Sequence, residues 1–135
     1  MNAMNAQSAQ SAEDARAVLT KYYEYANAGD WDRWCDLFAE DQVMDEQLAG
    51  HIEGLETLRS MMKGMGTMYR VFRNEPVHFL VDGEKAAAVS HLTAVSASGE
   101  AIEAEVMNFF RIVDGRIAYM ANYHDTVPFQ VLSQG

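Results

Sequence analysis

The chain has 135 residues, of which 49% are hydrophobic, and carries a formal net charge of -10. Its length is sufficient for one domain with a buried core, and its charge repels the phosphates of nucleic acids and anionic lipid headgroups. We therefore expect one domain with no nucleic-acid or membrane partner. The sequence shows no signal peptide or membrane-spanning run, and the lone Cys35 excludes an internal disulfide, so we expect a cytoplasmic protein.

The first twelve residues, MNAMNAQSAQSA, are small or polar apart from two methionines. A segment of this composition buries little apolar surface, which predicts a flexible tail over residues 1–12. Residues 13–135 contain no linker and no internal repeat, so we expect them to form a single folded domain.

Two helices are predicted at the start of the folded part. Apolar residues recur at helical spacing from Glu13 onward and put Tyr22 in the middle of the apolar stripe, with Tyr23 to one side. Gly29 favours the end of this helix, because glycine enters the left-handed region without a steric penalty, and Asp30 can cap the next helix. The second helix should be short, and its two tryptophans should plug the base of the fold.

A short strand pair is predicted around Gly50, where the alternating segment QVMDEQLAGHIEG is interrupted. Met44, Glu46 and Leu48 share one face of this pair, and Asp45 lies on the other. Because a slip of one position turns every side chain over, the sequence leaves open whether Glu46 or Asp45 faces the interior.

The rest of the chain predicts a third helix and then a sheet. Residues 55–69 have a helical pattern, but Gly64 and Gly66 weaken the end of that helix. Four strand-like segments follow, and the short glycine-containing turns between them indicate an antiparallel meander. These segments are residues 71–81, 85–97, 100–113 and 116–129. Helices followed by a long sheet indicate the α+β class, with the sheet bent around the helices.

Three segments of the chain carry a family resemblance: ANAGDWDRWCDLFAEDQVMDE, HIEGLETLRSMM and FFRIVDGRIAYMANYHD. Together they resemble the nuclear transport factor 2-like (NTF2-like) superfamily and, within it, the SnoaL-like polyketide cyclases and the ketosteroid isomerases. The resemblance implies a cone in which three N-terminal helices pack in a strongly curved mixed or antiparallel sheet and enclose one pocket. It also implies a homodimer formed through the outer face of the sheet.

The same resemblance implies a set of site residues. The isomerases place a tyrosine, a carboxylate and a protonated aspartic acid in the pocket, and these positions fall on Tyr22, Glu46 and Asn108. The third group is therefore an asparagine in this chain. The SnoaL-like cyclases use a carboxylate on the final strand, where this chain offers Asn122 and His124.

The chemistry of these residue types supports the same interpretation. Glu46, if held among apolar neighbours, can act as a general base. Tyr22 and Asn108 can donate hydrogen bonds to the oxygen of an enolising carbonyl, and His124 can carry a proton near neutral pH. Each residue also has a simpler interpretation: a core tyrosine, a solvated glutamate, asparagines paired with the backbone, or a surface histidine.

The pocket is expected to bind an apolar molecule. Its predicted binding residues are Met44, Leu48, Met62, Met65, Met120 and Phe110. Thioether side chains adapt to irregular ring systems, which favours a polyketide- or steroid-like substrate. We expect no cofactor and no metal, because the sequence has neither a nucleotide-binding glycine motif nor metal-ligand spacing. The segment EVMNF lacks the Arg-x-Asp element of limonene epoxide hydrolases, which disfavours epoxide hydrolysis.

The predicted function is that of a cofactor-independent isomerase or cyclase, which enolises a small hydrophobic carbonyl compound by acid–base chemistry. Two alternatives remain: a non-catalytic module for ligand binding or dimerisation, and a dehydratase that uses a tyrosine and a histidine. A homodimer is expected through a semi-apolar outer sheet face. This face contains Val89, His91, Thr93 and Val95.

Overall fold

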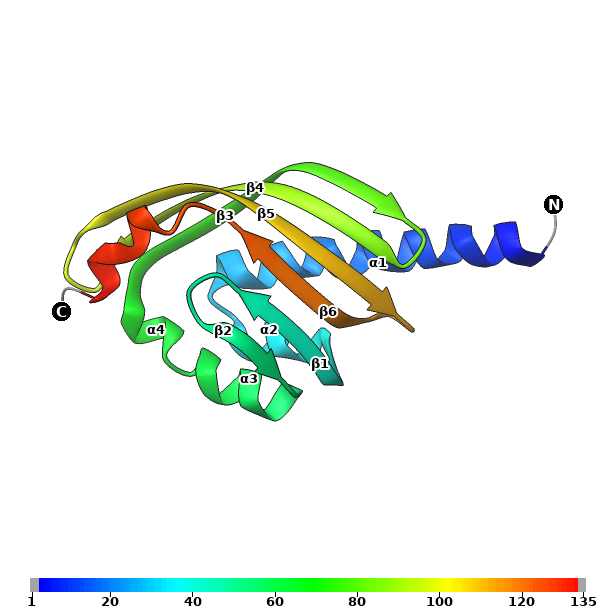
Figure 1. The fold of residues 1–135 in the computed structure, drawn as a ribbon, viewed down its shortest axis with the longest axis horizontal. Helices are drawn as coiled ribbons and strands as arrows, with labels where there is room; N and C mark the ends of the chain where they lie inside the picture. The colour runs from blue at the N-terminus through cyan, green and yellow to red at the C-terminus, as the bar shows by residue number, and fades with distance from the viewer. Residues whose placement is uncertain (1–2, 134–135) are drawn as a thin grey trace.

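The computed structural model describes residues 3–133, which form four α helices, six strands and one 3-10 helix (Figure 1). The helices are α1 (Ala3–Ala28), α2 (Trp31–Asp36), α3 (Leu55–Met62) and α4 (Met65–Met68), and the 3-10 helix is η1 (Val127–Ser133). The strands are β1 (Phe38–Glu46), β2 (Gly50–Glu53), β3 (Tyr69–Asp82), β4 (Lys85–Ser96), β5 (Ala101–Val113) and β6 (Arg116–Tyr123).

The six strands form one sheet in the order β2-β1-β6-β5-β4-β3. All neighbours in this sheet are antiparallel except β1 and β6, which run parallel. The long strands arch over α3 and α4, and α1 runs along the sheet (Figure 1). This arrangement confirms the predicted α+β class with a curved, mixed sheet, as well as the meander of the last four strands.

The parallel pairing of β1 with β6 joins segments that are far apart in the sequence, and it was not predicted in detail. The pairing sets Met44 beside Met120 and Asp45 beside Ala121. At its start, the backbone N–H of Ile117 donates to the carbonyl of Leu37 at 2.9 Å. The end of β1 and its turn therefore lie next to the end of the C-terminal strand.

Side chains alternate along β5 between the face of the sheet that packs on the core and the outer face. Its inward side chains are all buried: Ile102, Ala104, Val106, Asn108, Phe110 and Ile112. Between them, Glu103, Glu105 and Met107 are exposed on the outer face. This alternation follows from the two-residue period of a strand, and it confirms the predicted assignment of the two faces.

The link between α1 and α2 has the predicted caps. Gly29 has a φ of 71°, in the left-handed region where glycine is favoured. The N–H groups of Gly29 and Asp30 donate to the carbonyls of Ala26 and Tyr25, which is the Schellman arrangement at a helix end. The Asp30 side chain then accepts from the N–H of Arg33 and caps α2.

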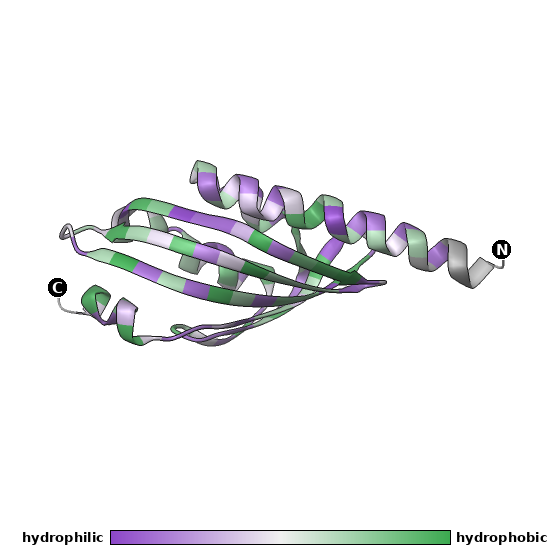
Figure 2. Ribbon diagram, turned by 90° about the horizontal axis from the view of Figure 1, so that it is seen from above, coloured by the Kyte–Doolittle hydropathy of each residue, from purple (hydrophilic) through white to green (hydrophobic). Residues whose placement is uncertain are grey.

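The N-terminal helix begins earlier than the sequence suggested. The structure continues α1 back to Ala3, so residues 3–12 of the segment predicted as a flexible tail are helical. Residues 1 and 2 lie outside the described residues. Alanine and glutamine have high helix propensity, so an existing helix extends easily through this segment. The coloured part of this helix already projects beyond the ends of the strands in Figure 2.

Two other element ends also differ from the predictions. The helix predicted over residues 55–69 ends at Met62, and only the short α4 follows before β3 begins at Tyr69. The two glycines that weaken this segment account for the break. The strand predicted over residues 116–129 ends at Tyr123, because the chain turns into η1 and buries Phe129.

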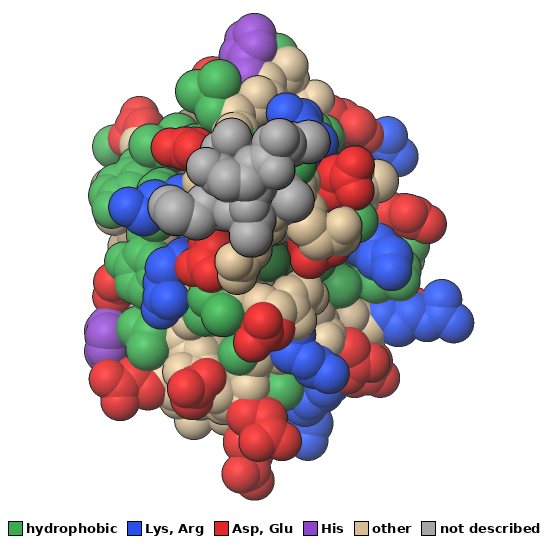
Figure 3. All heavy atoms as spheres, turned by 90° about the vertical axis from the view of Figure 1, so that its right-hand side faces the viewer, with side chains coloured by type: hydrophobic (Ala, Val, Ile, Leu, Met, Phe, Trp, Pro, Cys, Tyr) green, Lys and Arg blue, Asp and Glu red, His purple; other side chains and the backbone are tan. Residues whose placement is uncertain are grey.

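No helix within residues 3–133 is both long and apolar enough to span a lipid bilayer. Acidic and basic side chains are interspersed over the end of the molecule from which α1 projects (Figure 3). On this face the acidic side chains are therefore not gathered into a patch that lacks basic ones.

Candidate active site

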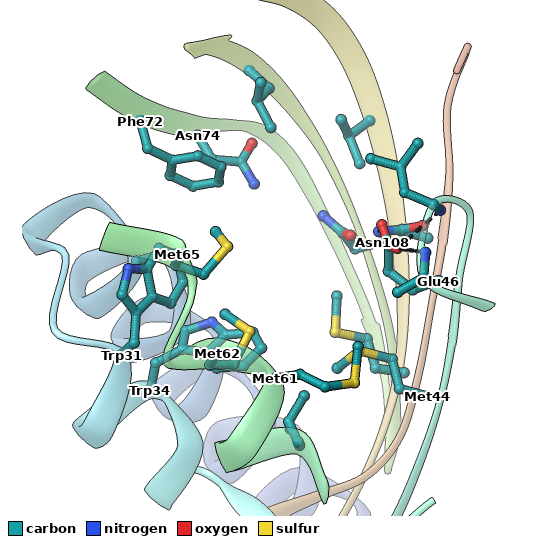
Figure 4. A pocket seen from close by; sticks show the side chains of 18 of the residues that line it. Trp31, Trp34, Met44, Glu46, Met61, Met62, Met65, Phe72, Asn74 and Asn108 are labelled. Carbon is teal, nitrogen blue, oxygen red and sulfur yellow. Dashed lines mark hydrogen bonds between the residues drawn. The ribbon is translucent and has the colours of Figure 1, made fainter. Parts of the chain in front are cut away.

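A cavity of about 250 Å³ lies between the inner face of the sheet and the helices (Figure 4). Its wall is mostly apolar, and six methionines contribute to it: Met44, Met61, Met62, Met65, Met68 and Met120. The hydroxyl, carboxyl, amide and imidazole groups at the wall belong to Tyr22, Tyr69, Glu46, Asn74, Asn108, Asn122 and His124. All five predicted catalytic residues are among them, so the fold brings them together at one cavity.

Glu46, the last residue of β1, faces the cavity. Its Oε2 accepts from the backbone N–H of Leu48 at 2.9 Å and from that of Ala49. Its Oε1 accepts from Asn122 Nδ2 at 3.2 Å. A carboxylate offers about four acceptor sites, so three hydrogen bonds fix the group and leave one site for another proton donor. The group is both anchored and available to a ligand.

Asp45 points to the outer face of the sheet, which answers the question that the sequence left open. Its Oδ2 accepts from the Tyr119 hydroxyl, and its Oδ1 contacts His51 Nδ1, both at 2.6 Å. These hydrogen bonds, with that of Tyr119 the larger, lower the pKa of Asp45. Hydrogen bonds to Asp45 and then to Glu53 raise the pKa of His51.

We predict that His51 titrates above its ordinary pKa of 6.5 and Asp45 below its ordinary 3.8, as measured by NMR titration. Because the pKa of His51 is raised, its contribution to stability is complete below about pH 6.5 and is lost as the pH rises through the folded value. The contribution of Asp45 is present above about pH 3.8 and is lost as the pH falls through its folded value. Asp45→Asn should return His51 toward 6.5, and an unchanged titration would contradict the pairing.

Tyr22 is buried at the cavity wall within an aromatic cluster. Its ring lies 4.8 Å from that of Tyr23, 5.4 Å from Trp34 and 5.2 Å from Phe110, measured between centroids. Burial raises the pKa of Tyr22 well above its usual value, with smaller contributions from Tyr23 and Glu46. The phenol therefore stays protonated at neutral pH and can serve as a hydrogen-bond donor.

Asn108 is buried and is held by a residue that the sequence did not single out. Its Nδ2 donates to the Tyr23 hydroxyl at 2.9 Å. Tyr23 was predicted to lie to one side of the helix stripe, but it is buried, and burial raises its pKa to about 12. Since a hydroxyl can accept or donate, Tyr23 can hold either end of the amide, and a ligand carbonyl would favour the orientation that presents Nδ2 to the cavity.

Asn122 and His124 have different roles at the wall. Both ends of the Asn122 amide are hydrogen-bonded within the protein: its Oδ1 accepts from the Gln47 N–H at 2.9 Å, and its Nδ2 donates to Glu46. It therefore positions Glu46. His124 Nδ1 lies 2.8 Å from the carbonyl of Asp125, which in the neutral ring makes Nδ1 the donor and Nε2 an acceptor. The His124 ring packs against Phe129 at 4.8 Å.

The predicted binding residues divide into two groups. Met44, Leu48, Met62, Met65 and Met120 all line the cavity. Phe110 does not, and its assignment as a substrate-binding residue is wrong. It is completely buried in the core behind Tyr22, because the inward face of β5 at that point meets helix α1 and not open space.

Sequence reasoning missed several residues of the wall. Trp31 and Trp34, predicted only to plug the base of the fold, line the cavity together with Phe72. Asn74 on β3 is buried there as well, and its Oδ1 has no hydrogen-bond partner among the described residues. A buried polar atom without a partner costs about 1–3 kcal/mol. The signal for Asn74 was present, since asparagine is depleted in strands.

The arrangement combines one carboxylate, neutral donors and an apolar wall. Such a site can remove a proton from a carbon acid and stabilise the charge that develops on the neighbouring oxygen. No arginine or aspartate lines the cavity in the part of the chain that the structure describes. Within residues 3–133, no three His, Cys, Asp or Glu side chains are placed to share a metal ion.

Several solved structures share this fold. An NTF2-like protein of unknown function from Burkholderia pseudomallei aligns with a TM-score of 0.81 at 16% identity, covering 90% of this chain and 98% of that chain. A protein from Xanthomonas campestris pv. campestris, provisionally named a polyketide cyclase, gives 0.79 at 23%, covering 92% and 98%. An LEH-like epoxide hydrolase of M. tuberculosis gives 0.77 at 18%, covering 92% of each chain. At these identities the likeness concerns the fold alone.

The sequence itself also has a family match. No curated protein matches the chain. Residues 19–120, which extend from α1 to β6 and carry most of the cavity wall, match the SnoaL-like domain family. Because this match spans more than half of the chain and agrees with the curved sheet and its cavity, the chain belongs to the SnoaL-like family of the NTF2-like superfamily.

Proposed function

We propose that the chain is a cofactor-independent cytoplasmic isomerase or cyclase, which enolises a small hydrophobic carbonyl compound in the cavity. The observation that supports this most is the anchored carboxylate of Glu46 in the same apolar cavity as Tyr22 and Asn108. During enolisation the substrate loses a proton from carbon, which the carboxylate can accept. Negative charge then develops on the carbonyl oxygen, which the neutral donors can stabilise.

In the proposed reaction, the Glu46 carboxylate takes a proton from the carbon next to the substrate carbonyl. The electron pair of that C–H bond forms a C=C bond, and the carbonyl oxygen gains negative charge while it accepts hydrogen bonds from Tyr22 and Asn108. Return of the proton from Glu46 to another carbon gives an isomer. Attack of the enolate carbon on a second carbonyl gives a ring, and the new alkoxide then takes the proton. Both routes regenerate the carboxylate.

The size of the cavity narrows the proposed substrate. A closed apolar cavity of about 150 Å³ binds a single benzene ring. The cavity of about 250 Å³ therefore suits a compound with two fused rings, and part of a larger polyketide- or steroid-like molecule would lie outside it. The methionines of the wall can adapt to such flat, irregular shapes.

Deuterium exchange of the α-hydrogens of 2-tetralone, a two-ring ketone, tests this proposal. We expect the protein to accelerate the exchange over buffer when it is followed by NMR in D2O, and 2-naphthol to inhibit it by occupying the cavity. A protein that binds the ketone without accelerating the exchange would contradict enolisation.

A dehydratase is the second candidate, and the place of His124 at the cavity with Nε2 as an acceptor favours it. In that reaction His124 would take the proton next to the carbonyl, and Tyr22 would protonate the departing hydroxyl, which leaves as water; the proton on His124 then returns to Tyr22 and restores both groups. His124→Gln separates the two candidates, because it should stop the dehydration of a β-hydroxyketone and leave the exchange in 2-tetralone intact.

A non-catalytic ligand-binding module is the third candidate, favoured by the structural use of Glu46. The carboxylate holds the turn after β1, which is reason enough for a glutamate at this position. Under this alternative, 2-naphthol and 2-tetralone bind in the cavity and are recovered without exchange.

We also propose a homodimer through the outer face of β4 and β5. In this face Val89 lies beside Met107, which is 39% exposed, and His91 contacts Glu103 and Glu105. Exposed apolar side chains among polar ones are typical of a protein interface. We predict a dimer by sedimentation at micromolar concentration and a monomer for Met107→Glu. A wild-type monomer under these conditions would contradict the proposal.

A further inference from the structure

We propose that Asn74 anchors the substrate at the far end of the cavity, by binding a second oxygen function opposite the reacting carbonyl. This inference rests on the proposed function, because it adds a feature to the substrate of the same site. It makes Asn74 a specificity-determining residue outside the predicted catalytic set.

The position of Asn74 fits a contact with a ligand. The residue lies on β3, is 6% exposed, and lines the cavity. Its Oδ1 has no hydrogen-bond partner among the described residues. Figure 4 shows its amide on the opposite wall from Asn108 and Glu46, with the nitrogen toward the open space. A molecule that spans the cavity would therefore meet polar groups at both ends.

The fold does not need the Asn74 side chain for its own hydrogen bonds. The backbone of Asn74 is clamped by Asn27 of α1, whose Oδ1 accepts from the Asn74 N–H at 2.7 Å and whose Nδ2 donates to the Asn74 carbonyl at 3.1 Å. These contacts fix the strand and aim the side chain. Phe72 on the same strand and Leu92, the partner on β4, give the amide apolar neighbours. An apolar residue would suit this place better unless a ligand uses the amide.

The charges at the wall define the kind of oxygen that Asn74 can bind. The amide can bind a hydroxyl at both ends, because its Nδ2 donates to an oxygen and its Oδ1, which has no partner among the described residues, accepts from a hydroxyl hydrogen. No lysine or arginine lines the cavity within residues 3–133, and Glu46 repels an anion, so an ionised carboxylate or phosphate is disfavoured. The inferred substrate is a neutral compound of about two fused rings with an oxygen function at each end.

The test compares 2-naphthol with 2,6-dihydroxynaphthalene by isothermal titration calorimetry. We expect the wild type to bind the diol about 3- to 10-fold more tightly, as one additional net hydrogen bond allows. Asn74→Leu should abolish this preference and change the affinity for 2-naphthol less than about 2-fold, because 2-naphthol needs only one polar end. Gln42→Leu is the matched control: it removes another buried amide away from the cavity and should keep the preference.

Each other result overturns the inference. Equal affinities of the wild type for the two ligands, or an equal loss of affinity for both in Asn74→Leu, would show that Asn74 does not bind a second oxygen of the ligand. If the leucine variant fails to fold by circular dichroism, Asn74→Ala takes its place and must show the same loss of preference. If neither ligand binds to the wild type, the proposed function itself fails and the inference falls with it.

Discussion

Replacing Glu46 by glutamine is expected to lower the exchange rate of 2-tetralone by about 10²- to 10⁴-fold, because an amide cannot accept the α-proton. The fold should survive this change. The glutamine oxygen can still accept from the N–H groups of Leu48 and Ala49, but the acceptor for Asn122 is lost. One lost hydrogen bond costs about 1 kcal/mol of the free energy of unfolding. The rate is measured by NMR and the stability by urea denaturation.

Asp45→Asn is the matched control for this prediction. It removes the same charge from the neighbouring position of β1, but its contacts are with His51 and Tyr119 on the outer face. The exchange rate should therefore change less than about 2-fold. An unchanged rate in Glu46→Gln, or an equal loss in Asp45→Asn, would remove Glu46 from the mechanism.

Replacing Phe110 by alanine should lower the free energy of unfolding by about 3–5 kcal/mol, because the truncation leaves a cavity in the core behind Tyr22. This is a large part of the 5–15 kcal/mol that typically stabilises a domain, so we expect a lower melting temperature and partial unfolding in mild urea. A loss below about 1 kcal/mol would contradict the placement of Phe110 in the core.

Met61→Ala provides the contrast. Met61 is also a large apolar residue, but it lines the cavity and is 42% exposed. Its truncation should change stability by less than about 0.5 kcal/mol. The same change should weaken the binding of 2-naphthol, because the ligand loses part of the wall. The pair of variants thus separates residues that hold the fold from residues that hold the ligand.

The sequence predicted those parts of the fold that depend on short-range patterns. The two-residue period assigned the faces of β5 correctly, and Gly29 with Asp30 marked the change of helix, because both signals act within a few residues. The position of Glu46 at the cavity also agreed with the inward face predicted for it. Only the structure could decide whether Glu46 or Asp45 faces the cavity, because the register of a strand is set by its pairing with other strands.

The parts that were missed depend on contacts between distant segments. Tyr23 is buried because α1 meets more than one strand of a curved sheet, which widens the buried stripe beyond the one predicted for a single flat face. Asn74 lies at the cavity in a part of β3 whose backbone is held by Asn27, a residue 47 positions away in the chain. Neither the curvature nor this clamp has a local pattern in the sequence.

A crystal structure with 2-tetralone bound tests the central claim most directly, namely that the cavity places a carbonyl between neutral donors and beside a carboxylate. We expect the ketone oxygen within about 2.7–3.2 Å of the Tyr22 hydroxyl or the Asn108 amide, with the α-carbon next to Glu46. A ketone that binds outside the cavity, or that lies inside it with its α-carbon away from Glu46, would contradict the account.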